Sequence, residues 1–347
     1  MTVVLPIRNE GDHIEACLER ILAQDYPHEA LEVLVVDGQS TDGTLDAVRR
    51  VQERHPDADV KVLENPARVV PPALNLGIRA ARGDVIVRMD GHTVPATDYV
   101  SACVAALGRS GAANAGGVIA AVGTTRFGRA VAVASLHPLG AGDARYRIGG
   151  AAGDVDTVPF GAFRRRAFER VGLFDESLVR NQDDEMNVRL RAAGERVYLD
   201  PAIRATYTPR GTVRGLWSQY FQYGWWRVET LKRHPGTLRW RQLLPIGMTV
   251  AFVVAALLAP FWNVARVGLA MAAMVYLGVL GAVAWRIAPP RVDAALVALA
   301  FAILHFAYGF GFVVNAATAG RAPYRAEPAR VPRLEPRPVG AAGEVGA

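Results

Sequence analysis

The chain has 347 residues, a formal net charge of +6 and only two cysteines. This length supports a substantial hydrophobic core, which excludes peptide hormones and disulfide-stapled mini-proteins. With glycine counted and tyrosine left out, roughly 58% of the residues are apolar, against 45–50% in ordinary soluble domains. Part of the chain is therefore expected to lie in lipid. Because Cys17 and Cys103 show no metal-ligand spacing, neither a disulfide framework nor a zinc site is expected.

Strand and helix patterns alternate in the part of the chain before Arg241. Apolar, β-rich segments occur at 2–7, 32–37, 60–63 and 85–89, with helical stretches between them. This alternation predicts an α/β domain with a mostly parallel sheet covered by helices. The first two segments are nearly continuous in Val, Leu and Ile, as in strands that are buried on both faces. Functional residues in such sheets gather at the carboxyl ends of the strands.

Three charge-free stretches follow, at 242–265, 267–285 and 294–320. Each is close to the roughly 20 residues that a helix needs to cross a bilayer, so three spans are the simplest prediction. The N-terminal apolar segment is too short for a signal peptide, which predicts that the first half of the chain stays in the cytoplasm. Three crossings would then put the arginine-rich tail outside, against the positive-inside rule. A re-entrant first segment would keep the tail inside, and the two topologies remain alternatives.

Composition sets the remaining boundaries. The segment 214–227 combines aromatic residues with arginines, which is typical of a helix at a membrane surface. We expect an α/β domain at 1–210, this interface helix at 211–241 and a membrane domain at 242–320. Residues 321–347 are rich in Pro, Arg, Ala and Gly and are predicted to be disordered.

Acidic side chains follow two of the predicted strands. Asp37 ends the segment 32–37, where a carboxylate can accept hydrogen bonds from a nucleoside; a simple polar turn is the alternative. Asp90 and His92 follow the segment 85–89. Their spacing of two places both on one side of an extended chain, where they can face one divalent ion; a solvated turn is the alternative.

A third acidic group, Asp183, Asp184 and Glu185, precedes apolar residues at helical spacing, so the carboxylates are expected on the first turn of a helix. The helix dipole stabilises acids there, which would be a purely structural role. The alternative role is that of a general base, because a carboxylate near other charges can be tuned for proton transfer.

Other chemistries find little support in the sequence. No G-x-G-x-x-G follows the first strand, and neither a phosphate-binding P-loop nor a G-x-S-x-G elbow occurs. The arginines cluster near the predicted spans and in the tail, where anionic lipid accounts for them. A nucleic-acid partner is therefore not expected.

The order of motifs resembles that of the inverting family 2 glycosyltransferases, which have the nucleotide-sugar-binding GT-A fold. The resemblance covers roughly residues 1 to 230. It rests on PIRNE at 6–10, VDGQSTDGT at 36–44, NLG at 75–77, RGD at 82–84, DGH at 90–92, GAFR at 161–164, GLFDE at 172–176 and QDDEMNVRL at 182–190. A narrower similarity, through 65–92 and the aromatic helix, is to bacterial exopolysaccharide glucosyltransferases of the succinoglycan type.

The resemblance implies a Rossmann-like GT-A domain followed by C-terminal transmembrane helices. It implies transfer of a hexose, glucose by the narrower similarity, from a UDP-sugar to a hydroxyl group of a lipid-linked saccharide. The product would be an exopolysaccharide or cell-envelope glycan, made alongside other biosynthesis proteins. The location implied is the bacterial inner membrane, with several crossings and a cytoplasmic catalytic domain.

Site residues are carried over from the family motifs. Asp183 is implied as the general base, with Asp184 and Glu185 as rivals, and Asp90 and His92 are implied to hold Mg²⁺ or Mn²⁺. The donor-binding set is Pro6, Arg8, Glu10, Asp37, Arg68 and Asp90. The acceptor and interface set is Gly161, Gln222, Trp225 and Trp226.

The sequence departs from the family pattern at three motifs. The usual D-x-D ends here in His92, a poorer ligand for Mg²⁺ than a carboxylate, and Gln182 replaces the glutamate usual before Asp183. The Q-x-x-R-W motif of membrane-bound synthases is present at 222–226 without its arginine, which counts against processive polymerisation. Two alternatives remain: transfer of one sugar to a polyprenyl phosphate, and an inactive membrane scaffold of a glycan export complex.

Overall fold

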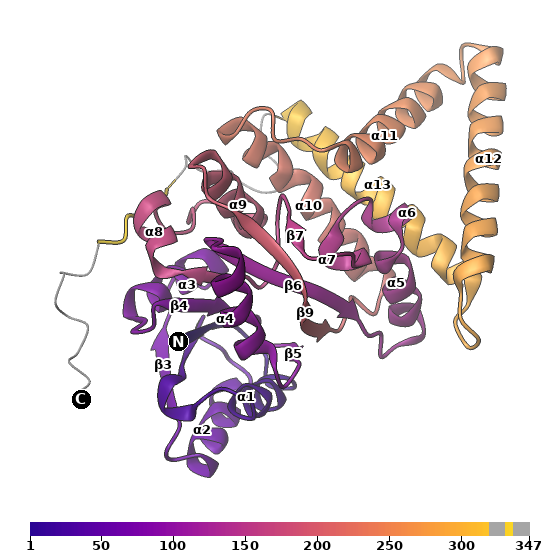
Figure 1. Ribbon diagram of the computed structural model, residues 1–347. Helices are drawn as coiled ribbons and strands as arrows, with labels where there is room; N and C mark the ends of the chain where they lie inside the picture. The colour runs from indigo at the N-terminus through magenta and orange to yellow at the C-terminus, as the bar shows by residue number, and fades with distance from the viewer. Residues whose placement is uncertain (319–329, 336–347) are drawn as a thin grey trace.

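The computed structural model describes residues 1–318 and 330–335. In this part of the chain, one nine-stranded sheet is covered by helices, and four longer helices pack beside it (Figure 1). The strands are β1 (Thr2–Ile7), β2 (Glu32–Asp37), β3 (Asp59–Glu64), β4 (Val85–Arg88), β5 (Thr93–Pro95), β6 (Asn114–Ala121), β7 (Gly153–Asp154), β8 (Ala162–Arg164) and β9 (Val197–Tyr207). Their order is β3-β2-β1-β4-β8-β6-β9-β5, and β7 pairs with β9.

The first half of the sheet agrees with the sequence prediction. All four predicted strands are confirmed, and β1 pairs in parallel with both β2 and β4, while β2 pairs in parallel with β3. Side chains alternate between two cores, because Val3 and Leu5 face one side of the sheet and Val4 faces the other. Helices α1 (Ile14–Leu22), α2 (Thr44–Arg54) and α4 (Tyr99–Ser110) cover the first side, and α3 (Val70–Ala80), α8 (Arg165–Val171) and α9 (Gln182–Ala192) cover the second.

The second half of the sheet is mixed. Strand β8 is antiparallel to β4 and β6, whereas β6 and β9 are parallel and β9 is antiparallel to β5 and β7. The predicted parallel pattern therefore extends only across β3-β2-β1-β4. Strands β5, β7 and β8 are only two or three residues long, too short to show an apolar period. The longer β6 and β9 lack a continuous apolar run, because β6 contains Gly116 and Gly117 and β9 is interrupted by Asp200 and Pro201.

Four long helices follow the sheet: α10 (Val213–Arg233), α11 (Trp240–Leu258), α12 (Asn263–Ile287) and α13 (Ala294–Thr318). Three of them, α11 to α13, are long and apolar enough to cross a membrane, which confirms the number of apolar segments. The first boundary differs, since α11 ends at Leu258 and Arg266 lies in the first turn of α12. The chain turns around Pro260, which cannot continue a helix without losing a hydrogen bond.

Helix α13 is packed against the α/β domain, unlike α11 and α12. Half of its most apolar window is buried, compared with 6% for α11 and 11% for α12. Its partner is α10, and the two backbones approach closely at two glycines. A Cβ on Gly224 would lie 1.9 Å from the carbonyl oxygen of Tyr308, and one on Gly311 would lie 2.0 Å from that of Phe221. Small residues permit such close helix contacts.

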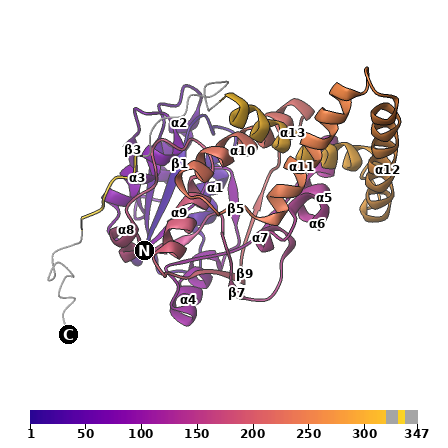
Figure 2. The same ribbon diagram turned by 90° about the horizontal axis from the view of Figure 1, so that it is seen from above.

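Helices α11 and α12 form a hairpin that projects from the body of the molecule (Figures 1 and 2). Both ends of the hairpin are attached to the α/β domain. At the start of α11, Arg241 pairs with Asp143 at 2.7 Å and also with Asp156. After α12, Asp293 pairs at 2.8 Å with Arg126, which begins α5 (Arg126–Leu136).

The C-terminal segment 330–335 lies against the α/β domain. The Leu173 N–H donates to the Pro332 carbonyl oxygen at 2.8 Å, and the Arg330 N–H donates to a carboxylate oxygen of Asp175 at 2.8 Å. Leu334 is buried in the same core as α3 and α8. The prediction of disorder is wrong for these six residues, because their backbone groups and Leu334 find partners on the domain. The remainder of 321–347 lies outside the described residues.

The glycine contact between α10 and α13 predicts the effect of a single methyl group. Gly224→Ala should lower the free energy of unfolding by about 1–3 kcal/mol. The added Cβ would overlap the backbone of α13, which cannot shift locally without moving the helix. The matched control is Gly278→Ala on α12, where no atom lies within 4 Å of an added Cβ. Thermal unfolding of the detergent-solubilised proteins measures both. Equal stability of the two variants would contradict the close contact.

Candidate active site

The carboxyl ends of the parallel strands meet at one edge of the sheet, where the loops after β1 and β2 are joined. The Asn9 N–H donates to the Ser40 hydroxyl at 2.9 Å, and the Thr41 N–H donates to the Asn9 side-chain oxygen at 2.9 Å. Three residues in the loops after β1, β2 and β3 have left-handed backbone: Asn9 (φ 55°), Gln39 (φ 58°) and Arg68 (φ 60°). Strained backbone of this kind clusters at ligand-binding sites.

Predicted donor-binding residues lie together at this edge. The Asp37 carboxylate is almost fully buried and accepts hydrogen bonds from the backbone and hydroxyl groups of Ser40. Arg8 packs over Gly38, and the exposed Arg68 donates to the Gln39 side chain at 2.6 Å. Pro6 is buried within β1, in register with Val36.

A cavity of about 570 Å³ adjoins this edge, within the range of small-molecule sites. Its walls come from strand ends, from the start of α9 and from the helices beside the sheet. The lining includes Arg88, Asp90, His92, Tyr146, Arg147, Arg180, Asp183, Asp184, Tyr207, Tyr220, Tyr223, Leu244, Leu304 and Tyr308. Carboxylates at the sheet edge therefore share one cavity with residues of α11 and α13.

Arg88 connects the two acidic groups that face the cavity. One of its terminal nitrogens lies 2.8 Å from Asp90, and the other lies 3.3 Å from Asp183. Its guanidinium also lies 5.1 Å from the centre of the Phe160 ring. Sequence analysis missed this residue because it ends an apolar strand. The available signal was an arginine inside a strand otherwise predicted to be buried, where arginine occurs only when paired.

Asp183 has the electrostatic character of a base. Burial raises the pKa of Asp183, the Arg88 charge lowers it, and the neighbouring charges of Asp90 and Asp184 raise it, so that the net direction is upward. A carboxylate with a raised pKa accepts a proton more readily. Asp184 also lines the cavity, but its carboxylate is paired with the buried guanidinium of Arg227.

Asp90 and His92 both line the cavity. They lie on a turn after β4 and not on an extended segment, since the Thr93 N–H donates to the Asp90 carbonyl oxygen at 3.0 Å. The His92 Nδ1 lies 3.0 Å from a carboxylate oxygen of Glu10, and this hydrogen bond raises the pKa of His92. Arg88 contacts one oxygen of Asp90. Among the described residues, no group of three or more His, Cys, Asp or Glu side chains gathers as a metal site.

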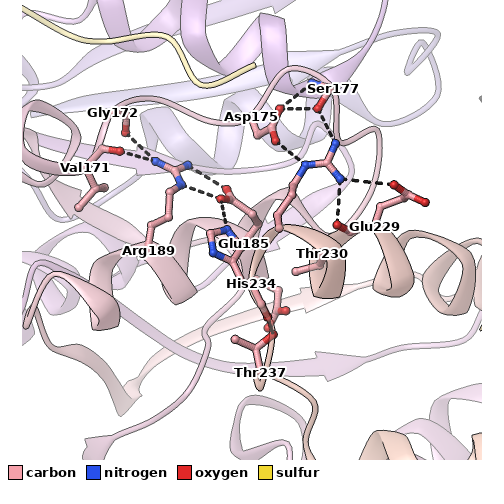
Figure 3. Close-up of polar contacts among 12 residues, drawn as sticks. Val171, Gly172, Asp175, Ser177, Glu185, Arg189, Glu229, Thr230, His234 and Thr237 are labelled. Atoms are coloured by element: carbon pink, nitrogen blue, oxygen red, sulfur yellow. Dashed lines mark hydrogen bonds and ion pairs between the residues drawn. The ribbon is translucent and has the colours of Figure 1, made fainter. Parts of the chain in front are cut away.

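Glu185 lies outside the cavity, within the network of ion pairs shown in Figure 3. Its carboxylate is 2.7 Å from Arg189 and 2.8 Å from His234. Burial alone would raise the pKa of Glu185, but the hydrogen bonds from His234 and Arg189 lower it below its ordinary value. Successive helical residues point in different directions, so the acids at the start of α9 do not share one role.

The predicted acceptor residues do not line the cavity. Trp225 and Trp226 are 0% and 2% exposed and pack against Leu178, so they cannot reach a membrane surface or a substrate. The expectation is wrong because α13 packs over this part of α10. Gln222 accepts a hydrogen bond from Arg180 at 3.2 Å, and the Gly161 carbonyl oxygen accepts one from the Arg88 N–H at 3.0 Å. Gln222 and Gly161 therefore contact residues that line the cavity but do not line it themselves.

Comparisons with known proteins identify the family. Residues 2–172 match the family model for glycosyl transferase family 2. The chain is 32% identical over 313 residues to the succinoglycan biosynthesis protein ExoA of Rhizobium meliloti, covering 89% of this chain and 93% of that protein. The chain is a family 2 glycosyltransferase.

Other relatives of this family 2 glycosyltransferase support the same fold and class of reaction. It is 28% identical over 267 residues to the dolichyl N-acetyl-alpha-D-glucosaminyl phosphate 3-beta-D-2,3-diacetamido-2,3-dideoxy-beta-D-glucuronosyltransferase of Methanococcus voltae, covering 74% of this chain and 82% of that one. The mannosyltransferase PcManGT from Pyrobaculum calidifontis, solved with GDP-Man and Mn²⁺, aligns with a TM-score of 0.62 at 23% identity, over 89% and 86% of the two chains. The predicted GT-A fold is confirmed.

The position of Glu185 predicts a structural effect without a catalytic one. Glu185→Gln should lower the free energy of unfolding by about 3 kcal/mol, because it leaves Arg189 and His234 without their charged partner. Glu185 has a lowered pKa, so its contribution in the parent is present above about pH 4 and is lost as the pH falls through the folded value.

Denaturant unfolding over a range of pH measures this effect. The control is Asp46→Asn, which removes an exposed ion pair with Arg49 and should cost less than about 0.5 kcal/mol. Turnover of folded Glu185→Gln should stay near the parent value. Loss of turnover with unchanged stability would show that Glu185 acts in catalysis after all.

Proposed function

We propose that this family 2 glycosyltransferase transfers glucose from UDP-glucose to a hydroxyl group of a lipid-linked saccharide in exopolysaccharide or cell-envelope glycan synthesis. The observation that carries the proposal is the shared cavity, which joins Asp90 and Asp183 to residues of α11 and α13. A donor held at the sheet edge and an acceptor arriving from lipid would meet there. The similarity to the succinoglycan biosynthesis protein ExoA supports the class of product, and glucose is carried over from the narrower sequence resemblance.

The reaction assigns Asp183 the role of general base. Its carboxylate would take the proton from the acceptor hydroxyl while the hydroxyl oxygen attacks the anomeric carbon. The bond from that carbon to the diphosphate breaks on the opposite face, so the configuration inverts. Arg88 holds Asp183 in position, and its charge limits the rise in the pKa of Asp183. The net upward shift of the pKa makes this carboxylate a stronger base than an exposed aspartate.

The donor set would hold the nucleotide at the joined loops. Asp37 is fixed by Ser40 at the end of β2, and Arg8 and Arg68 stand exposed beside it. A carboxylate here can accept hydrogen bonds from a ribose or base, and the arginines can contact phosphate oxygens. Glu10 would act through His92, which it orients.

Asp90 and His92 are the residues that would hold a divalent cation beside the donor diphosphate. Metal-binding histidines commonly give their second ring nitrogen to a carboxylate, as His92 does to Glu10. PcManGT, which shares the fold, was solved with Mn²⁺. Mg²⁺ or Mn²⁺ bound there would supply positive charge for the departing diphosphate.

The assignment of the base predicts how turnover responds to one substitution. Asp183→Asn should leave UDP-glucose affinity nearly unchanged and reduce turnover by about 100-fold or more, the scale of general-base catalysis. UDP release by the purified protein, with Mn²⁺ and lipid extract, measures turnover, and calorimetric titration measures donor affinity.

Asp184→Asn is the matched control, since Asp184 lines the cavity but is paired with Arg227. A larger loss in that variant would move the base to Asp184. Near-normal turnover of Asp183→Asn would contradict a hydroxyl acceptor and favour transfer to a polyprenyl phosphate, whose oxygen needs no strong base. Absence of turnover and of donor binding in the parent protein would favour the scaffold alternative.

We further propose that the chain crosses the bacterial inner membrane twice, through the α11–α12 hairpin, with the α/β domain in the cytoplasm. Arg241 and Asp293 attach both ends of the hairpin to that domain. Helix α13 stays beside the domain. Near the C-terminal end of α13, the side-chain amide of Asn315 donates to the Glu229 carboxylate of α10 at 3.0 Å. An even number of crossings also agrees with the position of 330–335 and with the positive-inside rule.

Single cysteines test this topology. A cysteine in place of Asn263, at the start of α12, should react with a membrane-impermeant maleimide in intact spheroplasts. Cysteines replacing Pro290 and Glu335 should react only after permeabilisation. The native Cys17 and Cys103 are buried and give a low background. Labelling at 335 in intact spheroplasts would mean an odd number of crossings and would contradict the proposal.

A further inference from the structure

The cavity contains two arginines that lack a carboxylate partner. Arg88, Arg227 and Arg241 also line it, and each is paired with an aspartate. Arg147 and Arg180 make no ion pair with any residue in the described ranges 1–318 and 330–335. Charged side chains that are partly enclosed are normally paired, because removing a charge from water is costly. Two unpaired cations in one cavity therefore point to an anionic ligand.

Aromatic rings surround Arg147. One terminal nitrogen donates to the Tyr207 hydroxyl at 3.0 Å, and the guanidinium lies 5.6 Å from the ring centre of Tyr146 and 5.9 Å from that of Tyr207. Burial raises the pKa of Tyr220, another phenol that lines the cavity. The rings hold the cation in place but supply no negative charge to balance it.

The second unpaired arginine, Arg180, also lies near Tyr223. Its Nε donates to the Gln222 side chain at 3.2 Å, and its two terminal nitrogens have no partner in the part of the chain that the structure describes. Burial raises the pKa of Tyr223, while the charges of both Arg147 and Arg180 act to lower it. Both guanidinium groups line the same cavity as this α10 residue.

We propose that Arg147 and Arg180 bind the phosphate or diphosphate group of the lipid carrier that delivers the acceptor. The inference rests on the proposed function and names the part of the acceptor that this cavity would recognise. Paired guanidinium groups suit phosphate because they supply several donors and fixed charge. Leu244 and Leu304 continue the cavity wall into α11 and α13, where a hydrocarbon chain would lie.

The same chemistry could serve the donor diphosphate, so the test separates the two sources. The probes are farnesyl diphosphate, farnesol, inorganic diphosphate and UDP with Mn²⁺, each titrated calorimetrically into the full-length protein in detergent. The variants are Arg147→Gln, Arg180→Gln and the double substitution. Arg145→Gln is the matched control, because Arg145 lies on the same short helix, α7 (Arg145–Ile148), and does not line the cavity.

Each cavity variant should weaken farnesyl diphosphate binding by about 10-fold or more, the scale of a charge-assisted hydrogen bond, and leave UDP affinity within about twofold. Farnesol should bind weakly to every protein, and Arg145→Gln should behave as the parent. If UDP affinity falls instead while farnesyl diphosphate is unaffected, the arginines serve the donor and the proposal is wrong. Unchanged affinities for both ligands would overturn it as well.

Turnover distinguishes this inference from the proposed function. If the parent protein releases UDP from UDP-glucose but the arginine variants retain full affinity for farnesyl diphosphate, only the inference fails. If the parent turns over no nucleotide sugar yet binds farnesyl diphosphate through these arginines, only the proposed function fails.

Discussion

The buried ion pair between Arg233 and Asp175 is the contact on which the arrangement of the parts depends (Figure 3). Arg233 ends α10, and its Nε lies 3.0 Å from the fully buried Asp175 carboxylate in the loop after α8. The other oxygen of Asp175 accepts the Arg330 N–H. Burial alone would raise the pKa of Asp175, but hydrogen bonds from Ser177 and from the Arg330 N–H, together with the charge of Arg233, hold it below its ordinary value. One carboxylate thus joins the α/β domain, α10 and the C-terminal segment.

The same network extends to α13. Glu229, one turn before Arg233, accepts hydrogen bonds from Lys232 and from Asn315 of α13. Because burying an unpaired charge is costly, the network permits few alternative positions for α10 relative to the sheet. That placement brings Tyr220 and Tyr223 of α10 to the cavity. The geometry of the active site is therefore set partly by ion pairs that never touch a substrate.

Charge is distributed unevenly across the cavity. We expect this distribution to decide which part of the cavity each substrate occupies. Asp90 follows β4, Asp183 begins α9, and Arg88 lies between them, where the proposed sugar nucleotide and metal ion would bind. The same cavity also contains Arg147 and Arg180, the proposed phosphate site. Apolar side chains of α11 and α13 complete the wall. A ligand with a hydrocarbon chain, a phosphate and a sugar would meet these surfaces in that order.

Sequence alone determined the elements whose signals are local. The strands β1 to β4, the position of Asp37 and Asp90 at strand ends, and the acids on the first turn of α9 could all be predicted. Continuous apolar runs and helical spacing are properties of neighbouring residues. The family motifs likewise identified the fold. Hydropathy identified α11 to α13 as apolar helices. It could not show that α13 is packed against the domain and α12 is not, since both have the same mean hydropathy of 2.1.

Only the tertiary structure decided which of these residues face the cavity. Glu185 turns into an ion-pair network while Asp183 reaches the cavity, although both stand on one helical turn. Trp225 became core because α13 covers it. Arg88 is significant because it pairs with Asp183, which lies far away in the chain. Arg147 is significant because it contacts Tyr207 but has no carboxylate partner among the described residues. The orientation of a side chain depends on what packs against its element, and no local pattern records that.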